Sequence, residues 1–129
     1  MKGLLDTHTL LWWDHEAEKL SPRVLSFCQD PANTLLVSVA SVWELQIKVV
    51  TGKLVLRDPL AALVERQERN AVTFVPVDLA HIYALGALPI HHKDPFDRLI
   101  IAQAIVAGAT LLSADLLVAL YAPAVTVLW

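Results

Sequence analysis

The sequence contains almost no cysteine, and this shortage narrows the choice of fold and function. Cys28 is the only cysteine among 129 residues, which excludes an internal disulfide bond and a zinc site built from cysteines. Such sparing use of cysteine is typical of the reducing cytoplasm, so we expect a cytoplasmic protein. A chain of this length is expected to form one domain, residues 1–129, because it can bury roughly two-thirds of the surface that its unfolded form exposes.

Charged residues are also scarce, at 18% of the chain, whereas hydrophobic residues make up 56%. Even so, long hydrophobic runs are missing: the longest segments without Asp, Glu, Lys, Arg or His are 99–114 and 116–129. Both are shorter than the ~20 apolar residues of a membrane-spanning helix, and Asp6 comes too early for the apolar region of a signal peptide. We therefore expect no membrane segment, and expect the apolar surplus to form buried parallel strands and a subunit interface.

Short apolar runs alternate with helix-like segments along the whole chain, without a linker or an internal repeat. The predicted strands are 2–5, 34–38, 72–77, 110–112 and 125–128. The predicted helices are 7–14, 22–30, 39–51, 60–69, 79–87, 96–107 and 115–121. Before three of these helices a Ser-Pro or Asp-Pro pair indicates a capping residue, at Ser21, Asp58 and Asp94. The alternation predicts an α/β domain with a central, mainly parallel sheet flanked by helices on both faces.

Four acidic residues fall where this topology brings them to one edge of the sheet. Asp6 ends the first strand, and Asp115 follows the fourth. Glu44 and Asp97 lie in the early turns of the third and sixth helices. Because ligands of parallel α/β sheets bind at the carboxyl ends of the strands, we expect these four carboxylates to meet there.

Two interpretations of these acids are open. Taken singly, each is well explained as a carboxylate that stabilises a helix N-terminus, and this is the better explanation for Asp94, which precedes a proline and a helix. Taken together, they indicate a metal site, because Glu44 and Asp115 lie in apolar segments where an unpaired carboxylate is costly. Carboxylate oxygens suit Mg²⁺ or Mn²⁺.

Several neighbouring residues have similarly divided interpretations. Thr7 and Ser113 either orient a metal-bound water or hydrogen-bond Asp6 and Asp115, or they are ordinary hydroxyls at helix starts. His91 and His92 point to opposite sides of an extended loop and make a poor paired metal site, so filling of the loop is favoured over contact with a substrate. The tryptophans are explained mainly by packing, and Trp43 is a candidate wall of the acidic pocket.

With these motifs in place, the chain resembles the PIN domain, specifically the VapC-like toxins of toxin–antitoxin pairs. The resemblance rests on four motifs in order: Leu-Leu-Asp-Thr-His at 4–8, Ser-Val-Trp-Glu-Leu at 41–45, Lys-Asp-Pro-Phe-Asp-Arg at 93–98 and Ser-Ala-Asp at 113–115. It implies a single PIN-like domain that is a Mg²⁺- or Mn²⁺-dependent endoribonuclease with one or two ions. It also implies a homodimer that is neutralised by a VapB-like antitoxin, whose C-terminal segment lies over the active-site groove.

The same resemblance assigns the catalytic and metal-binding roles to Asp6, Glu44, Asp97 and Asp115. Ser113 stands where threonine is commoner in the family and keeps the hydroxyl. The net charge of −3 is unusual for a protein that binds RNA, but without the four acids the rest of the chain carries +1. Candidate contacts to RNA phosphates are Lys48, Lys93 and Arg98. So few cations favour recognition of a particular RNA shape or loop.

Two other functions compete with this interpretation. A small phosphatase with an aspartyl nucleophile usually has a second acid two positions after the first, where this chain has His8. The alternative from a different class is a catalytically silent PIN-like module that only binds a protein partner. Metal-dependent cleavage of RNA would exclude that module.

Overall fold

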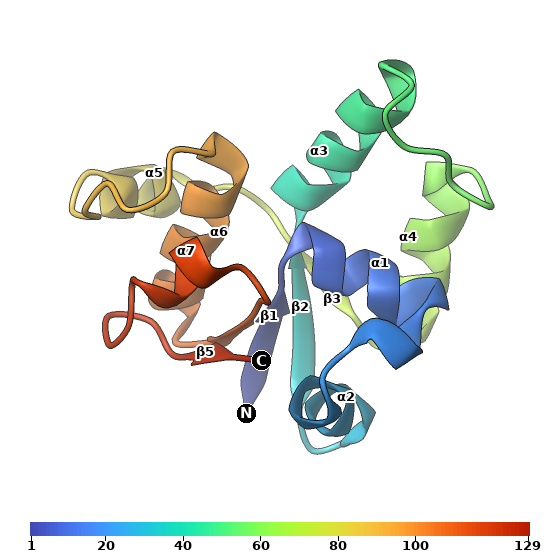
Figure 1. The fold of residues 1–129 in the computed structure, drawn as a ribbon, viewed down its shortest axis with the longest axis horizontal. Coiled ribbons are helices and arrows are strands. Elements are labelled where there is room, and N and C mark those ends of the chain that lie inside the picture. The colour runs from blue at the N-terminus through green and yellow to red at the C-terminus, as the bar shows by residue number, and fades with distance from the viewer.

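The computed structural model describes residues 1–129 and contains one sheet of five strands in the order β3-β2-β1-β4-β5 (Figure 1). The strands are β1 (Lys2–Leu5), β2 (Thr34–Ser38), β3 (Thr73–Val75), β4 (Thr110–Leu112) and β5 (Val127–Leu128). All four pairings are parallel, and in the centre Leu4 of β1 stands opposite Leu36 and Leu111. The predicted central parallel sheet is confirmed.

Helices follow the strands and cover both faces of the sheet, as predicted. They are α1 (Thr7–His15), η1 (Ala17–Lys19), α2 (Pro22–Gln29), α3 (Val39–Val50), α4 (Leu60–Arg69), α5 (Leu79–Leu85), α6 (Pro95–Ala107) and α7 (Leu116–Ala119). In Figure 1, α1, α2 and α4 lie on one side of the strands, and α5, α6 and α7 lie on the other. None of these helices combines the length and the apolar content that crossing a membrane requires.

The core consists of two apolar layers, one on each face of the sheet. Consecutive residues of a strand point to opposite faces, so Leu4 packs with Ile100 and Ile101 of α6, whereas Leu5 packs with Leu10 of α1. All five side chains are essentially inaccessible to solvent, and burial of each stabilises the fold by about 1.5–3 kcal/mol. This packing fixes the carboxyl ends of the central strands relative to the first turns of the surrounding helices.

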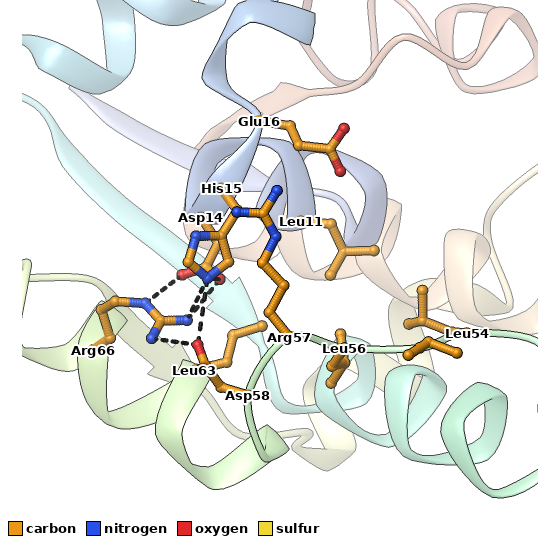
Figure 2. Close-up of a pocket in the computed structure, with 11 residues that line it drawn as sticks. Leu11, Asp14, His15, Glu16, Leu54, Leu56, Arg57, Asp58, Leu63 and Arg66 are labelled. Carbon is orange, nitrogen blue, oxygen red and sulfur yellow. Dashed lines mark hydrogen bonds and ion pairs between the residues drawn. The ribbon is translucent and has the colours of Figure 1, made fainter.

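A buried ionic network joins the end of α1 to α4 (Figure 2). The Asp14 side chain is only 2% exposed, and Arg66 donates to its two oxygens from Nε at 2.9 Å and from Nη2 at 2.8 Å. Gln67 Nε2 adds a third bond at 2.7 Å. Burial raises the pKa of the Asp14 carboxyl, but the bonds from Arg66 and Gln67 outweigh it and hold this pKa below its ordinary value.

The same network explains one wrong prediction at the start of α4. Asp58 was expected to cap this helix, but Pro59 occupies the capping position and Asp58 makes no such bond. Instead, Asp58 Oδ2 lies 3.0 Å from Arg66 Nη1 (Figure 2). The Asp58 carboxylate therefore pairs with the Arg66 guanidinium and does not bond the helix N-terminus. No local sequence pattern predicts this ion pair.

Candidate active site

The candidate acids meet in one open cavity of about 440 Å³ at the carboxyl ends of the central strands. The residues lining it are Asp6, Thr7, His8, Trp12, Glu44, Lys48, Asp94, Asp97, Ala114 and Asp115. Of the predicted site residues, the acids, Thr7 and Lys48 are therefore brought together, whereas Ser113, Lys93 and Arg98 do not line the cavity.

Asp6 is at once a helix cap and a wall of the cavity. It follows β1 directly, and its Oδ1 accepts the backbone N–H of Thr9 at 2.8 Å in the first turn of α1. The residue is almost fully buried, and its second carboxylate oxygen has no hydrogen bond from the protein. One oxygen thus satisfies the helix terminus, and the other is left for a ligand in the cavity.

Glu44 has both of its oxygens engaged by neighbouring side chains. Thr7 Oγ1 donates to Oε1 at 2.7 Å, and Lys48 Nζ lies 3.0 Å from Oε2, one turn further along α3. Ser41 Oγ lies 3.1 Å from the Thr7 hydroxyl and is fully buried. Thr7 therefore supports Glu44 and makes no bond to Asp6, and Lys48 is an ion-pair partner that also faces the cavity.

Asp94 and Ser113 occupy supporting positions at two helix starts. Asp94 Oδ1 accepts the backbone N–H groups of Phe96 and Asp97 at 2.8 and 3.1 Å, so it caps α6 as the sequence favours. The Ser113 hydroxyl is buried and accepts the backbone N–H of Asp115 at 3.2 Å. Both side chains shape the turns that present acids to the cavity.

Asp97 is the acid whose ionisation costs most. Burial raises its pKa most, and the nearby carboxylates of Asp94, Glu44 and Asp6 raise it further. His92 lowers it by less, so the pKa lies at about 7. The cavity thus gathers more negative charge than its own cations neutralise. Carboxylate oxygens and unbalanced negative charge are the features that a hard divalent cation requires, so the residues present fit Mg²⁺ or Mn²⁺.

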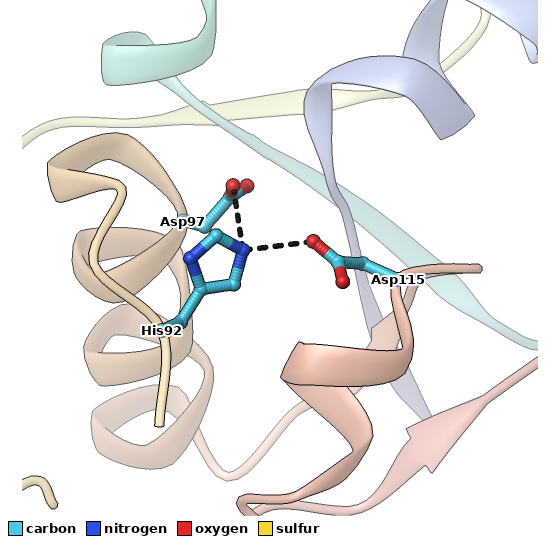
Figure 3. Close-up of side chains that lie close together, drawn as sticks. All are labelled: His92, Asp97 and Asp115. Atoms are coloured by element: carbon cyan, nitrogen blue, oxygen red, sulfur yellow. Dashed lines mark hydrogen bonds and ion pairs between the residues drawn. The ribbon is translucent and has the colours of Figure 1, made fainter. Parts of the chain in front are cut away.

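His92 contacts two of the candidate acids, Asp97 and Asp115, and the sequence did not predict this contact (Figure 3). It is only 8% exposed, and its Nε2 lies 2.8 Å from Asp115 Oδ2 and 3.2 Å from Asp97 Oδ2. Burial raises the pKa of Asp115, but the bonds from His92 and from the Leu117 backbone N–H outweigh it, so this pKa is lowered. His92 is buried within its loop, as the favoured interpretation expects, but its ring also contacts two acids that lie outside the loop.

The neighbouring His91 shows why the pair was hard to interpret. Its exposed ring packs edge-on against Tyr121 at a centroid distance of 5.1 Å. The two adjacent rings therefore have different partners. Only the spatial position of Asp115, more than twenty residues later, reveals which of the two rings meets the acids.

The other predicted contacts lie outside the cavity. Lys93 is exposed to solvent. Arg98 Nη1 donates to the carbonyl oxygen of Pro89 at 2.9 Å and to Tyr121 Oη at 3.1 Å, so it braces a loop. Trp43 is 63% exposed and packs edge-on against Phe96, so it does not wall the pocket as suggested.

The aromatic wall is formed by α1 instead. His8 and Trp12 both line the cavity, with their ring centroids 6.0 Å apart. The Trp129 ring packs against the Trp12 ring, with their centroids 5.6 Å apart. In the sequence, His8 and Trp12 are spaced by one helical turn in the helix that follows Asp6. This spacing alone does not show whether the two rings pack in the core or line a cavity.

Comparisons with known proteins agree with this architecture. A family model described as the PIN domain matches residues 3–119. Among curated proteins, none matches the sequence.

Solved structures with the same fold include VapBC complexes. VapBC2 from Rickettsia felis, bound to a DNA fragment from their promoter, has a TM-score of 0.72 and 16% identity over 99% of this chain and 98% of that chain. DNA-bound VapBC from Salmonella typhimurium has a TM-score of 0.71 and 16% identity over 99% and 97%. VapBC-5 from Mycobacterium tuberculosis has a TM-score of 0.62 and 20% identity over 98% and 95%. At these identities, the similarity establishes the fold.

Proposed function

Because this chain belongs to the PIN domain family, we propose that it is a divalent-metal-dependent endoribonuclease and the toxin of a toxin–antitoxin pair. The observation that carries the proposal is the convergence of Asp6, Glu44, Asp97 and Asp115 in one cavity at the carboxyl edge of the sheet. The VapBC complexes that share the fold support the toxin role.

The cavity offers three carboxylates as ligands for Mg²⁺ or Mn²⁺, those of Asp6, Asp97 and Asp115. When bound, one or two such ions supply the charge that activates water for attack on a phosphodiester and stabilises the leaving oxygen. Glu44, which is held by Thr7 and Lys48, binds a second ion or orients the water. The near-neutral pKa of Asp97 means that cation binding competes with a proton at this carboxyl.

The lining of the cavity also supports an RNA substrate. Lys48 places one cation beside the acids, and Lys93 is exposed on the loop before α6. His8 and Trp12 add an aromatic wall on the same cavity, and unstacked RNA bases bind to such surfaces. We propose that the substrate is an RNA loop with splayed bases, because one or two cations give little general affinity for phosphate.

Two protein partners complete the proposal, a second copy of the chain and a VapB-like antitoxin. Large apolar side chains form an exposed stripe on one face of α3, at Val39, Trp43, Ile47 and Val50. Exposed apolar patches of this kind mark protein interfaces. We assign the stripe to the homodimer and the groove over the acids to the antitoxin.

The proposed activity is tested by incubating the purified chain with a pool of structured RNAs. We expect cleavage with Mg²⁺ or Mn²⁺, no cleavage in EDTA, and loss of cleavage in Asp6→Asn. The matched control is Asp30→Asn, because Asp30 also bonds a backbone N–H but is exposed and far in sequence from the acids. Cleavage that persists in EDTA or in Asp6→Asn contradicts the proposal. The remaining explanations would be a contaminating nuclease or a metal-free mechanism.

A further inference from the structure

The two ring nitrogens of His92 have different partners, and the partner of one nitrogen determines the state of the other. The backbone N–H of Asp94 donates to His92 Nδ1 at 3.1 Å. Nδ1 is therefore an acceptor and carries no proton. Because a neutral imidazole has one N–H group, the proton lies on Nε2, at the opposite edge of the ring.

The protonated Nε2 faces two carboxylates that come from different elements (Figure 3). It donates to Asp115 Oδ2 at 2.8 Å and lies 3.2 Å from Asp97 Oδ2. The nearest ligand atoms of all three residues lie within 4.8 Å of one another, close enough to share a metal ion. However, a nitrogen that carries a proton has no lone pair to offer a metal.

We propose that His92 is a positioning residue that holds Asp97 and Asp115 for metal binding and is not itself a ligand. This role rests on the proposed function, since it concerns the same acids. Asp97 belongs to α6 and Asp115 to the turn between β4 and α7, so the two side chains reach the cavity from separate elements. The Nε2–H group lies between two carboxylates that otherwise repel each other, and such supporting donors orient metal ligands in proteins.

The buried Tyr121 hydroxyl holds the backbone of His92 in place. The Tyr121 hydroxyl, in a residue that is 3% exposed, accepts the backbone N–H groups of His91 and His92 at 3.1 and 3.0 Å. It donates in turn to the carbonyl oxygen of Pro89 at 2.8 Å. The loop that carries His92 is thereby tied to the end of α7, so Tyr121 acts on the acids through His92.

The proton position is tested directly on the metal-free protein. A long-range proton–nitrogen correlation spectrum distinguishes the two neutral imidazole forms of His92, and the exposed His91 serves as an internal reference. We expect the Nε2–H form for His92, retained when Mg²⁺ is added. A proton on Nδ1, or loss of the Nε2 proton on addition of Mg²⁺, overturns the proposal and makes His92 a ligand.

The positioning role is tested by calorimetric titration of Mg²⁺ into the metal-free variants. Removing a supporting donor weakens metal binding about 10–100-fold, so we expect this loss in His92→Ala and a partial recovery in His92→Gln, which restores an N–H group. Tyr121→Phe should show a smaller loss. The matched controls, His91→Gln and the exposed Tyr83→Phe, should bind Mg²⁺ like the wild type. Unchanged or tighter binding in His92→Ala overturns the proposal.

Failure of this inference and failure of the proposed function give different results. If the wild type binds Mg²⁺ and His92→Ala binds it equally well, the metal site stands and the role of His92 falls. If the wild type binds no Mg²⁺ or Mn²⁺, the proposal of a metal-dependent nuclease is wrong, and so is the proposed role of His92 at a metal site.

Discussion

At the scale of single residues, the acids of the cavity differ in how their charge is balanced. Asp115 and Glu44 have hydrogen-bonding or cationic partners within the protein, and Asp6 is bonded by a helix N-terminus. Asp97 is buried beside other carboxylates and has the raised pKa. We infer that the raised pKa of Asp97 makes the metal-free protein less stable near neutral pH, and that a bound cation would offset this loss.

This imbalance predicts how the stability of the metal-free protein depends on pH. Because the pKa of Asp97 rises from 3.8 to about 7 on folding, the native state holds a proton that the unfolded state has lost. The Asp97 contribution is therefore greatest below pH 4 and is lost as the pH rises to about 7, by an amount on the order of 4 kcal/mol. Asp97→Asn should remove this dependence in EDTA, as measured by urea unfolding between pH 5 and 8. An identical pH profile in the variant would refute the assignment.

The aromatic wall gives a second prediction at this scale. His8 is exposed and lines the cavity, so His8→Ala should leave the folded structure intact and weaken binding of a short single-stranded RNA. A lost stacking contact is worth about 1 kcal/mol or more, which is several-fold in affinity. Fluorescence anisotropy with the inactive Asp6→Asn background measures this loss. His91→Ala is the matched control, and equal affinity in both variants would show that the bases do not bind at this wall.

At the scale of elements, the ionic network between α1 and α4 makes a separate prediction about stability. Arg66→Met leaves the buried Asp14 carboxylate without its cation, and an unpaired buried carboxylate costs about 3–5 kcal/mol. Asp14→Asn combined with Arg66→Met removes the charge as well, so the double variant should be more stable than Arg66→Met alone. Thermal unfolding of the single and double variants tests this coupling. Strictly additive effects would argue against it.

Most elements could be predicted because their signals are local. Ser21 and Asp94 precede prolines and cap α2 and α6, and the apolar runs of β1 and β2 have the predicted bounds. Strands at the edges were predicted too long, since β3 and β5 cover only Thr73–Val75 and Val127–Leu128. An edge strand extends only as far as its single neighbour pairs with it, and that length is not encoded in the strand alone.

The site was predictable to the extent that topology determines it. Parallel strands bring their carboxyl ends to one edge, so the meeting of Asp6 and Asp115 follows from the order of elements. The position of His92 and the bracing role of Arg98 do not follow from it. Both depend on how a loop folds against distant residues, in particular the Tyr121 hydroxyl, and no pattern in the loop specifies that contact.

At the scale of the whole molecule, the exposed stripe on α3 predicts how the chain associates. Val50 is 74% exposed at the end of this stripe, so Val50→Glu should convert a dimer into a monomer that remains folded. Val55→Glu is the matched control, because Val55 is 91% exposed but lies in the loop beyond α3. Light scattering coupled to gel filtration gives the mass of each. A monomeric wild type would show that the chain forms no dimer. A dimer unaffected by Val50→Glu would show that the dimer interface lies elsewhere.

The fold brings acidic residues that are far apart in the sequence together at one cavity. Two apolar layers hold the sheet between its helices, and the strand order gathers residues from both halves of the chain around one cavity. We propose that this cavity is a site for a divalent cation.

The most direct test is a crystal of the protein soaked in Mn²⁺, with an anomalous difference map recorded to locate the ion. We expect a peak in the cavity, bonded to carboxylate oxygens among Asp6, Asp97 and Asp115, with His92 Nε2 outside the ligand set. The absence of a peak from the cavity, in a crystal whose acids are open to solvent, would contradict it.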